Sequence, residues 1–321
     1  MPKVSVCIPT YNRVQLLQLA IASVQSQIYQ DWELIICDDG STDGTAAMMA
    51  QMTDRRIRYI RHPQNIGKSN NMRSGFAAAT GEYFIKFDDD DRLTPDFLAH
   101  TCTILDNDPT IDFVGTDHWV IDIHNVRDEQ QTQENSRRWG RAELPPGIVD
   151  NLLEVVFRQQ SFQIGATLFR RQTLQELDYM RPNLQNCEDN DLFVRLALAG
   201  KKGYYLPERL MEYRFHAQQQ GIDRAIPYLQ DKIRYLASYQ FDNRELEAMR
   251  QIRLAGTQEA LGLRLIEKGE TMEGRRLLQE AAGVLGSSRK SQVGLMLSYL
   301  PLSWRQGLWR WFRQVRPKDD A

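Results

Sequence analysis

Short apolar runs alternate with stretches of helical periodicity through the first 120 residues of the chain. Val4–Ile8 is apolar and ends at Pro9, and Arg13–Gln27 then carries apolar residues at helical spacing. The alternation continues with apolar runs at Trp32–Cys37, Ile57–Ile60 and Tyr83–Phe87 and with helical stretches near Gly44–Met52 and Ser69–Ala79. Strands that alternate with helices of this length predict an α/β fold, in which a mostly parallel sheet has helices on both faces.

The rest of the chain changes character twice. From Asn125 to Gly147 the sequence is polar and rich in Gln, Arg and Glu, which we interpret as a long mobile loop. Patterned sequence resumes at Leu152–Phe157, Gly165–Phe169, Glu188–Ala199, Tyr204–Leu206 and Met211–His216, and helical stretches then cover Ile226–Gln240, Glu245–Lys268 and Thr271–Leu285. We therefore expect an α/β domain over residues 1–222, a small helical region over 223–288 and a tail over 289–321.

Polar clusters follow three of the predicted strands directly. They are Thr10-Tyr11-Asn12, Asp38-Asp39 and Asp88–Asp91. Ligands of parallel sheets bind at the carboxyl ends of strands, so one crevice could collect all three clusters.

Asp88–Asp91 is the strongest local signal. Four adjacent carboxylates repel one another unless a cation or strong hydrogen-bond donors lie beside them. Because side chains alternate along an extended segment, Asp88 and Asp90 can face one site together. Carboxylate oxygens suit Mg²⁺ or Mn²⁺ held jointly with substrate phosphates. The competing interpretation is an acidic turn that caps the helix expected near Thr94, and the preceding strand favours the metal site.

The other clusters have two interpretations each. Asp39 could bind a nucleobase or ribose while Asp43 caps the next helix, and Lys68 after Gly67 could meet a diphosphate or belong to a plain turn. Glu188-Asp189 opens a helix, where acids are favoured by the dipole, and it could equally supply a general base. His216 is either structural or a metal ligand.

Composition and charge exclude several classes of protein. Hydrophobic residues make up 42% and charged residues 26%, a mix typical of a globular protein. The net charge of −2 gives no indication of a nucleic acid partner. The four cysteines form no CxxC pair, the apolar run at the N-terminus is too short for a signal peptide, and no stretch approaches the ~20 apolar residues of a spanning helix. We expect a cytoplasmic protein with reduced thiols.

The tail differs from the rest of the chain. Residues 281–321 hold seven Lys and Arg against two Asp, a charge of +5, and three of the six Trp lie within eight residues at Trp304, Trp309 and Trp311. On a helix from Ser303, an aromatic face would be flanked by arginines, which is typical of a helix in a membrane interface. The alternative is that these aromatic residues pack on the α/β domain or on a partner subunit.

Six motifs follow one another along the first 216 residues: Ser5–Arg13, Asp38–Thr45, Asn65–Gly67, Gly81–Asp91, Glu188–Arg195 and Tyr213–His216. In this order they resemble the motifs of glycosyltransferase family 2, whose members have the Rossmann-like GT-A fold. One departure is that Met72-Arg73 stands where many members carry Arg-Asn.

The resemblance implies an inverting transfer from a nucleotide-diphosphate sugar, UDP-linked, to a glycan or lipid-linked acceptor with Mn²⁺ or Mg²⁺. It assigns Asp189 as the catalytic base and Asp90 and His216 as metal contacts. The implied donor-nucleotide residues are Pro9, Thr10, Tyr11, Arg13, Asp38, Asp39, Gly67, Lys68, Asp88 and Asp89. Because the run is wholly acidic, Asp89 or Asp91 could share the ribose contact with Asp88. The resemblance also implies a place on the inner face of the plasma membrane.

The sequence disfavours three other functions. A nucleotidyltransferase that makes nucleotide sugars would need a glycine-rich loop after the first strand, and Pro9–Arg13 contains no glycine. A non-catalytic nucleotide-sugar-binding protein would be expected to lack the residues Asp90, Asp189 and His216, which are all present. A dinucleotide oxidoreductase is excluded because no GxGxxG follows a predicted strand.

Overall fold

A computed structural model describes residues 1–215, 222–305 and 307–308 of the chain. The chain divides into two compact units, Met1–Gln219 and Gln220–Ala321, which are described separately below. His216 and the aromatic residues Trp309, Trp311 and Phe312 lie outside the described residues.

The first unit is built on a nine-stranded sheet with the order β3-β2-β1-β4-β8-β6-β9-β5, in which β7 also pairs with β9. Four parallel strands form one half, β1 Val4–Thr10, β2 Trp32–Asp38, β3 Ile57–Arg61 and β4 Tyr83–Lys86. The other half holds β5 Arg92–Leu93, β6 Phe113–Ile121, β7 Gly147–Ile148, β8 Thr167–Arg170 and β9 Gly203–Arg214. Only β8, β5 and β7 run against the others, so the prediction of a mostly parallel sheet is confirmed.

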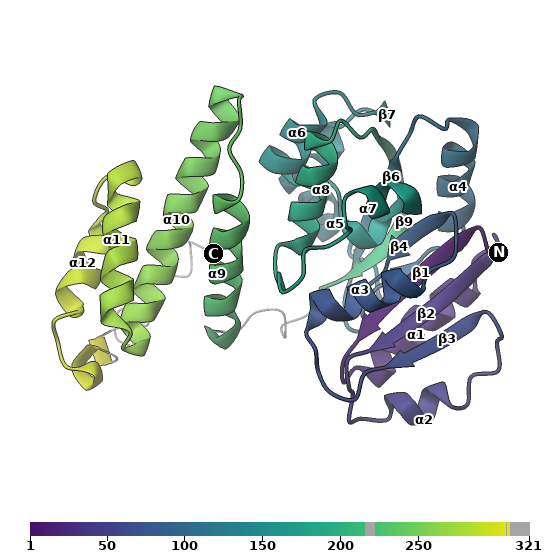
Figure 1. Ribbon diagram of the computed structural model, residues 1–321, viewed down its shortest axis with the longest axis horizontal. Helices are drawn as coiled ribbons and strands as arrows, with labels where there is room; N and C mark the ends of the chain where they lie inside the picture. The colour runs from purple at the N-terminus through teal and green to yellow at the C-terminus, as the bar shows by residue number, and fades with distance from the viewer. Residues whose placement is uncertain (216–221, 306, 309–321) are drawn as a thin grey trace. The chain divides into compact units, whose positions relative to one another are not determined.

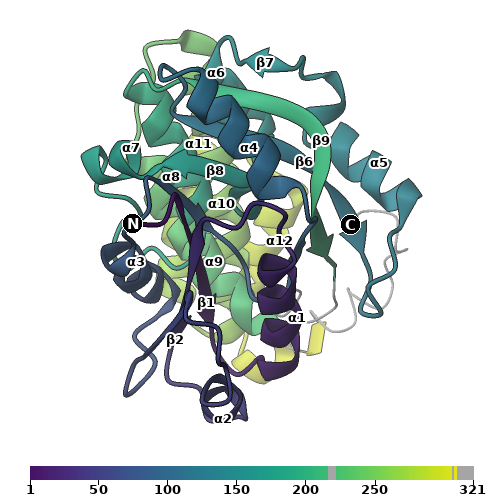
Figure 2. The ribbon, with the colours of Figure 1, turned by 90° about the vertical axis from the view of Figure 1, so that its right-hand side faces the viewer.

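Helices cover the sheet, and Figure 2 shows α1 and α3 on opposite sides of β1 and β2. The helices of the first half are α1 Val14–Gln25, α2 Thr45–Met49, α3 Lys68–Ala78 and α4 Phe97–Asn107. The apolar stripe of α1 (Leu17, Ala20, Ile21 and Val24) is buried in one core cluster with the apolar residues of β1 and β2. Burial of this stripe explains why the 3.6-residue period of the sequence predicted the helix.

The second half of the unit contains shorter helices. They are α5 Glu129–Arg138, α6 Leu152–Glu154, α7 Arg171–Glu176 and α8 Glu188–Leu198. Two 3₁₀ turns, η1 Arg141–Glu143 and η3 Ile164–Ala166, and a π-helical turn, η2 Val155–Gln159, complete it. The two predicted strands at Tyr204–Leu206 and Met211–His216 are one long strand, β9, with irregular pairing to β6 near Asp117.

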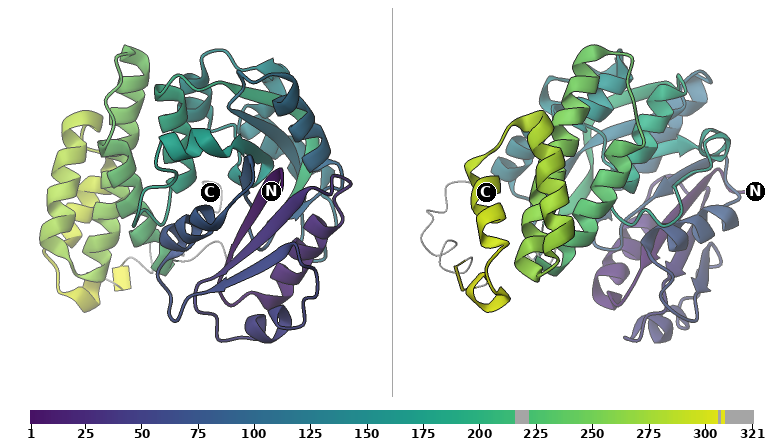
Figure 3. Two further views of the ribbon diagram at one scale, coloured as in Figure 1. Left: turned by 45° about the vertical axis from the view of Figure 1, so that its right-hand side comes forward. Right: turned by 60° about the vertical axis from the view of Figure 1, so that its left-hand side comes forward.

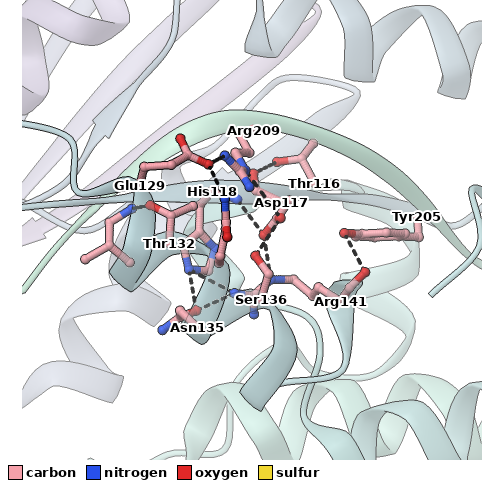
Figure 4. A network of polar contacts seen from close by, with 12 residues as sticks. Thr116, Asp117, His118, Glu129, Thr132, Asn135, Ser136, Arg141, Tyr205 and Arg209 are labelled. Atoms are coloured by element: carbon pink, nitrogen blue, oxygen red, sulfur yellow. Dashed lines mark hydrogen bonds and ion pairs between the residues drawn. The ribbon is translucent and has the colours of Figure 1, made fainter. Parts of the chain in front are cut away.

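The expected loop over Asn125–Gly147 is wrong, because helix α5 occupies Glu129–Arg138. This helix docks through polar contacts rather than through an apolar stripe (Figure 4). The Ser136 hydroxyl of α5 donates to Asp117 Oδ2 at 2.7 Å, and the buried Arg141 of the following turn, η1, donates from Nε to Asp117 Oδ1 at 2.7 Å. The Thr132 hydroxyl accepts from the backbone N–H of Val120 at 2.9 Å. A polar sequence therefore folds as a helix here because its polar groups find buried partners on β6.

The second unit is helical, as predicted. It contains α9 Ile222–Ala237, α10 Arg244–Lys268, α11 Thr271–Leu285 and α12 Arg289–Leu297, which lie side by side in Figures 1 and 3. Helices α10 and α11 approach very closely, since a Cβ atom on Gly274 would lie 2.7 Å from the carbonyl oxygen of Gly262. Leu261, Leu265 and Leu277 form the core of this unit.

The described part of the tail folds with this helical unit. Leu297 of α12 is buried, and Ser291 donates a hydrogen bond to Glu259 of α10. Arg305 is only 5% exposed, and its guanidinium donates to the carbonyl oxygens of Ile266 at 2.6 Å and Leu300 at 2.8 Å. Arg305 is one of the arginines expected to flank the aromatic face of a helix from Ser303, and for this residue the expectation is wrong, because its side chain is buried. Tyr299, Trp304 and Met296 remain largely exposed.

Within the described ranges no helix is long and apolar enough to cross a bilayer. Cys7, Cys37 and Cys102 are buried thiols, and the Sγ atoms of Cys7 and Cys37 share a hydrogen bond at 3.9 Å but form no disulfide.

Candidate active site

The loop after β1 contacts the loop after β4. The Thr10 hydroxyl donates to Asp89 Oδ2 at 2.7 Å. Arg13, immediately before α1, places Nη1 3.1 Å from Asp89 Oδ1 and 2.6 Å from Asp90 Oδ2. Because β1 and β4 are parallel neighbours, their carboxyl ends meet at one edge, and the predicted convergence of these two motifs is present in the structure.

The end of β2 joins the same edge through Asp39. Its backbone N–H donates to the carbonyl oxygen of Thr10 at 2.9 Å. Its two carboxylate oxygens accept from the backbone N–H groups of Ile66 at 2.7 Å and Gly67 at 3.2 Å. Gly67 has a φ of +90°, a backbone conformation that glycine adopts without steric cost. Asp39 thus fixes the turn that carries Lys68.

Asp38 is fully buried and has a structural environment. Its Oδ1 accepts from the backbone N–H of Ser41 at 2.8 Å, and its Oδ2 accepts from the hydroxyl of Tyr59. The contact of Asp38 with a donor nucleotide stays a prediction. Gly40 is required in this turn, because its φ is +80° and a Cβ atom would lie 2.8 Å from the backbone of Gln64.

The acidic run is compensated in part by a lysine that the sequence analysis missed. Lys86 of β4 is fully buried, and its Nζ lies 2.8 Å from both carboxylate oxygens of Asp88. Burial disfavours the charged form of Lys86, but the carboxylates of Asp189 and Asp88 outweigh it and raise the pKa of Lys86. In Asp88 burial opposes ionisation as well, and the charges of Lys86 and Lys68 lower its pKa below the ordinary value. Asp88 is therefore held as a carboxylate.

The start of α8 brings the predicted base to this cluster. Glu188 is buried and forms an ion pair with Lys68, whose Nζ lies 2.6 Å from Glu188 Oε1. Burial and the neighbouring charge of Asp189 raise the pKa of Glu188. Asp189 Oδ1 is buried and has no hydrogen-bond partner among the described residues. The two lysines thus pair with Asp88 and Glu188 and leave one oxygen of Asp189 without a donor.

The end of β9 contacts the acidic loop through Arg214. Arg214 is 1% exposed, and its Nε donates to the backbone carbonyl of Asp90 at 2.7 Å. Its backbone N–H donates to Asp91 Oδ1 at 2.8 Å, and its Nη1 donates to the carbonyl of Asp122 at 2.7 Å. Arg214, which stands two residues before His216 in the sequence, therefore fixes the backbone of the acidic loop.

Two predicted donor-binding residues differ in their exposure to solvent, and Arg73 has a structural role. Pro9 is buried at the end of β1, whereas Tyr11 is 46% exposed at the edge of the site. Arg73, at the position of the family departure, donates from Nη1 to the carbonyls of Asp178 at 2.8 Å and Met180 at 2.7 Å. It therefore holds the segment before α8.

The acidic loop fits a divalent cation. No cluster of three or more His, Cys, Asp or Glu side chains suited to a metal ion occurs within residues 1–215, 222–305 and 307–308. Mg²⁺ and Mn²⁺ sites of this kind need only one or two carboxylates, because substrate phosphates and water complete the shell. The guanidinium of Arg13 lies 2.6 Å from Asp90 Oδ2 and forms an ion pair with this oxygen. Asp90, together with donor phosphates, is the group that would hold the metal.

Comparison with known proteins places the chain in a family. The family model "Glycosyl transferase family 2" matches residues 5–173. A Bacillus subtilis protein named as a glycosyltransferase, EpsE, is 32% identical over 220 residues, which are 66% of this chain and 73% of that protein.

Solved structures share the fold. Staphylococcus aureus TarS 1–349, solved in complex with UDP-GlcNAc, has a TM-score of 0.65 at 14% identity, with 97% of this chain and 92% of that chain covered. The mannosyltransferase PcManGT of Pyrobaculum calidifontis, solved with GDP-Man and Mn²⁺, has a TM-score of 0.58 at 18% identity, with 97% and 85% covered. At these identities the likeness concerns the GT-A fold alone. From the family match and the 32% identity, we conclude that the chain belongs to glycosyl transferase family 2 and is a nucleotide-sugar-dependent glycosyltransferase.

Proposed function

We propose that this protein transfers a sugar, with inversion at the anomeric carbon, from a UDP-linked donor to a hydroxyl of a glycan or lipid-linked acceptor. The observation that carries the proposal is the buried, unpartnered Oδ1 of Asp189 within the same charged cluster as Asp88. A carboxylate oxygen that no protein donor engages can accept a proton from a substrate. The UDP-GlcNAc complex of TarS supports the choice of nucleotide.

The donor would lie along the carboxyl edge of β1, β2 and β4. Tyr11, Thr10 and Asp39 would contact the base and ribose, with Pro9 and Gly67 shaping the backbone around them. Asp88 and Asp89 would contact the ribose or the donor sugar. Lys68 and Arg13 would contact the diphosphate, since both are cations at the edge of the acidic cluster. These assignments rest on the family motifs and on the contacts that bring the motifs together.

The transfer step uses Asp189 as general base. The acceptor oxygen attacks the anomeric carbon from the side opposite the diphosphate and loses its proton to Asp189. The bond between the anomeric carbon and the diphosphate oxygen breaks, and the bonding electrons leave with the nucleoside diphosphate. A divalent cation, bound by Asp90 and the phosphates with His216 as a further contact, would supply positive charge against the charge that develops on the leaving group. The Mn²⁺ in the PcManGT complex supports a divalent cation.

Nucleotide binding tests this arrangement. Calorimetric titration of the protein with UDP should show strong binding with Mn²⁺ and large weakening in EDTA or in Asp90→Ala, because the phosphates and Asp90 share the cation. Asp31→Ala removes an exposed carboxylate away from the acidic run and serves as the matched control. Equal UDP affinity in Mn²⁺ and in EDTA would remove the cation from the scheme.

We also propose that the protein attaches peripherally to the inner face of the plasma membrane from the cytoplasm. The exposed Tyr299 and Trp304 of the helical unit precede a segment, 309–321, with four Lys and Arg against two Asp. Exposed aromatic side chains beside basic residues are typical of a surface that binds an anionic membrane.

A further inference from the structure

Arg13 lies where a divalent cation is expected. Its guanidinium contacts Asp90 Oδ2 at 2.6 Å and Asp89 Oδ1 at 3.1 Å. The charges of both carboxylates raise the pKa of Arg13 despite its burial, so the side chain remains a cation. A positively charged group of the protein therefore occupies the oxygen that would ligate the metal.

The contact can be broken without dismantling the loop. The Arg13 side chain is 28% exposed and extends from the residue before α1, whereas the side chain of Asp90 is 11% exposed. The backbone of Asp90 is held independently by Arg214, and Asp89 also accepts from Thr10 at 2.7 Å. Movement of Arg13 would thus leave the carboxylates in place.

Arg13 and a divalent cation compete for the same oxygen. Mg²⁺ and Mn²⁺ bind carboxylate oxygens at about 2.0–2.2 Å, and a guanidinium at hydrogen-bond distance from the same atom would repel them. A nucleoside diphosphate offers Arg13 a second anionic partner, since guanidinium groups pair well with phosphate oxygens.

We propose that Arg13 is a positioning residue that exchanges between Asp90 and the donor diphosphate, so that the donor opens the metal site. The inference rests on the proposed function, because it takes Asp90 as the metal ligand. By linkage, a diphosphate that removes Arg13 from Asp90 raises the affinity for the cation, and the cation raises the affinity for the diphosphate by the same factor.

Arg13→Gln separates this role from that of an ordinary donor contact. With Arg13 removed, Mn²⁺ alone should bind about fivefold more tightly, which corresponds to the loss of one partly exposed ion pair. The increase in Mn²⁺ affinity that UDP produces should shrink, because no guanidinium remains to be displaced. Arg13→Lys retains a competing charge and should stay close to the wild type.

The measurement is the EPR signal of free Mn²⁺ during titration of the full chain, with and without UDP. Arg92→Gln is the matched control, because Arg92 follows the acidic run but pairs with Glu212 at 3.4 Å. Equal or weaker Mn²⁺ binding by Arg13→Gln than by the wild type would overturn the inference, as would equal tightening in Arg92→Gln. Circular dichroism of each variant verifies that it is folded.

This outcome can be distinguished from a failure of the proposed function. If wild-type protein with UDP binds no Mn²⁺ in an Asp90-dependent manner, the metal role itself fails. If the wild type does bind Mn²⁺ through Asp90 and Arg13→Gln binds it no more tightly, then Asp90 holds the cation and Arg13 does not compete for it.

Discussion

Four neighbouring aspartates have four different environments. Asp88 pairs with the buried Lys86, and Asp90 with Arg13. Asp89 is buried, which raises its pKa to about 6 although Arg13 opposes the shift. Asp91 accepts from the backbone of Arg214, and burial followed by the charges of Asp90 and Asp88 raises its pKa well above the usual value. Identical neighbouring residues thus differ in their partners and in the environments of their carboxyl groups.

The acidic residues of the site could be predicted from the sequence, but their partners could not. Asp39 and Asp88–Asp91 were identified because each follows an apolar strand directly, a local signal. Lys86 was missed because it lies inside an apolar run and resembles a strand residue on the solvent side. Arg214 gave no local signal, because its partners Asp90 and Asp122 lie about 90 to 120 positions away in the chain.

A pH-dependent prediction concerns His118 in the network of Figure 4. Burial, followed by the charge of Arg141, lowers the pKa of His118 to about 3, against the opposing charge of Asp117. Arg209 also opposes protonation, while the hydrogen bond to Asn135 favours it. The unfolded chain takes up a proton at His118 below about pH 6.5 and the folded chain does not. The stability that neutral His118 contributes is therefore complete above pH 6.5 and is lost as the pH falls toward 3.

His118→Gln should remove this dependence. Between pH 7 and pH 5 the wild type should lose about 1–2 kcal/mol more of its free energy of unfolding than the variant. Urea denaturation of both proteins at the two pH values measures the difference. An identical pH dependence for the two proteins would mean that His118 titrates alike in the folded and unfolded states.

At the scale of elements, helices and strands with apolar periodicity were predicted well. The apolar runs of β1, β2 and β4 and the helices α10 and α11 match the structure closely. Helix α5 was missed because its mean hydropathy is strongly polar, and its buried residues are Thr132 and Ser136. Helix α5 folds because it has hydrogen-bond partners elsewhere in the chain, among them Asp117 on β6. The periodicity of a sequence does not predict such partners.

The position of the antiparallel strand β8 in the sheet could not be predicted from its local sequence pattern. Its sequence, Thr167–Arg170, is a short apolar run like that of any buried strand. The strand lies between β4 and β6, and the Thr173 hydroxyl, in the helix after β8, donates to Asp112 Oδ1, immediately before β6, at 2.7 Å. Strand order depends on contacts across more than 50 positions, so the sequence pattern predicts the strand but not its neighbours.

At the scale of the whole molecule, the tail carries the membrane prediction. Residues 289–305 fold with the helical unit, so deleting them would remove the buried side chains of Leu297 and Arg305 from that unit. A chain that ends at Leu308 keeps these helices and loses the segment 309–321 with its Arg and Trp residues. The full-length protein should float with anionic liposomes, and the shortened protein should stay in the soluble fraction. The floating fraction of the full-length protein should fall at high salt.

The control for this experiment is a full-length chain with Arg310, Arg313 and Arg316 changed to Gln, which retains the aromatic residues. It should float less than the wild type because each basic residue near an anionic surface adds about 1 kcal/mol. Recovery of both the full-length and the shortened, folded chain in the soluble fraction would exclude the membrane as the partner of the tail.

The most direct test of the account separates donor binding from transfer at Asp189. Once a donor has been found by screening nucleotide sugars for thermal stabilisation with Mn²⁺, release of the nucleoside diphosphate can be measured for the wild type, Asp189→Asn and Asp31→Ala. Asp189→Asn should bind the donor with nearly unchanged affinity and lose about 10²- to 10⁴-fold in rate, because only the proton acceptor is removed. Asp31→Ala should match the wild type. Near-normal turnover by folded Asp189→Asn would contradict the account and move the base to another residue, with Glu188 the next to be tested.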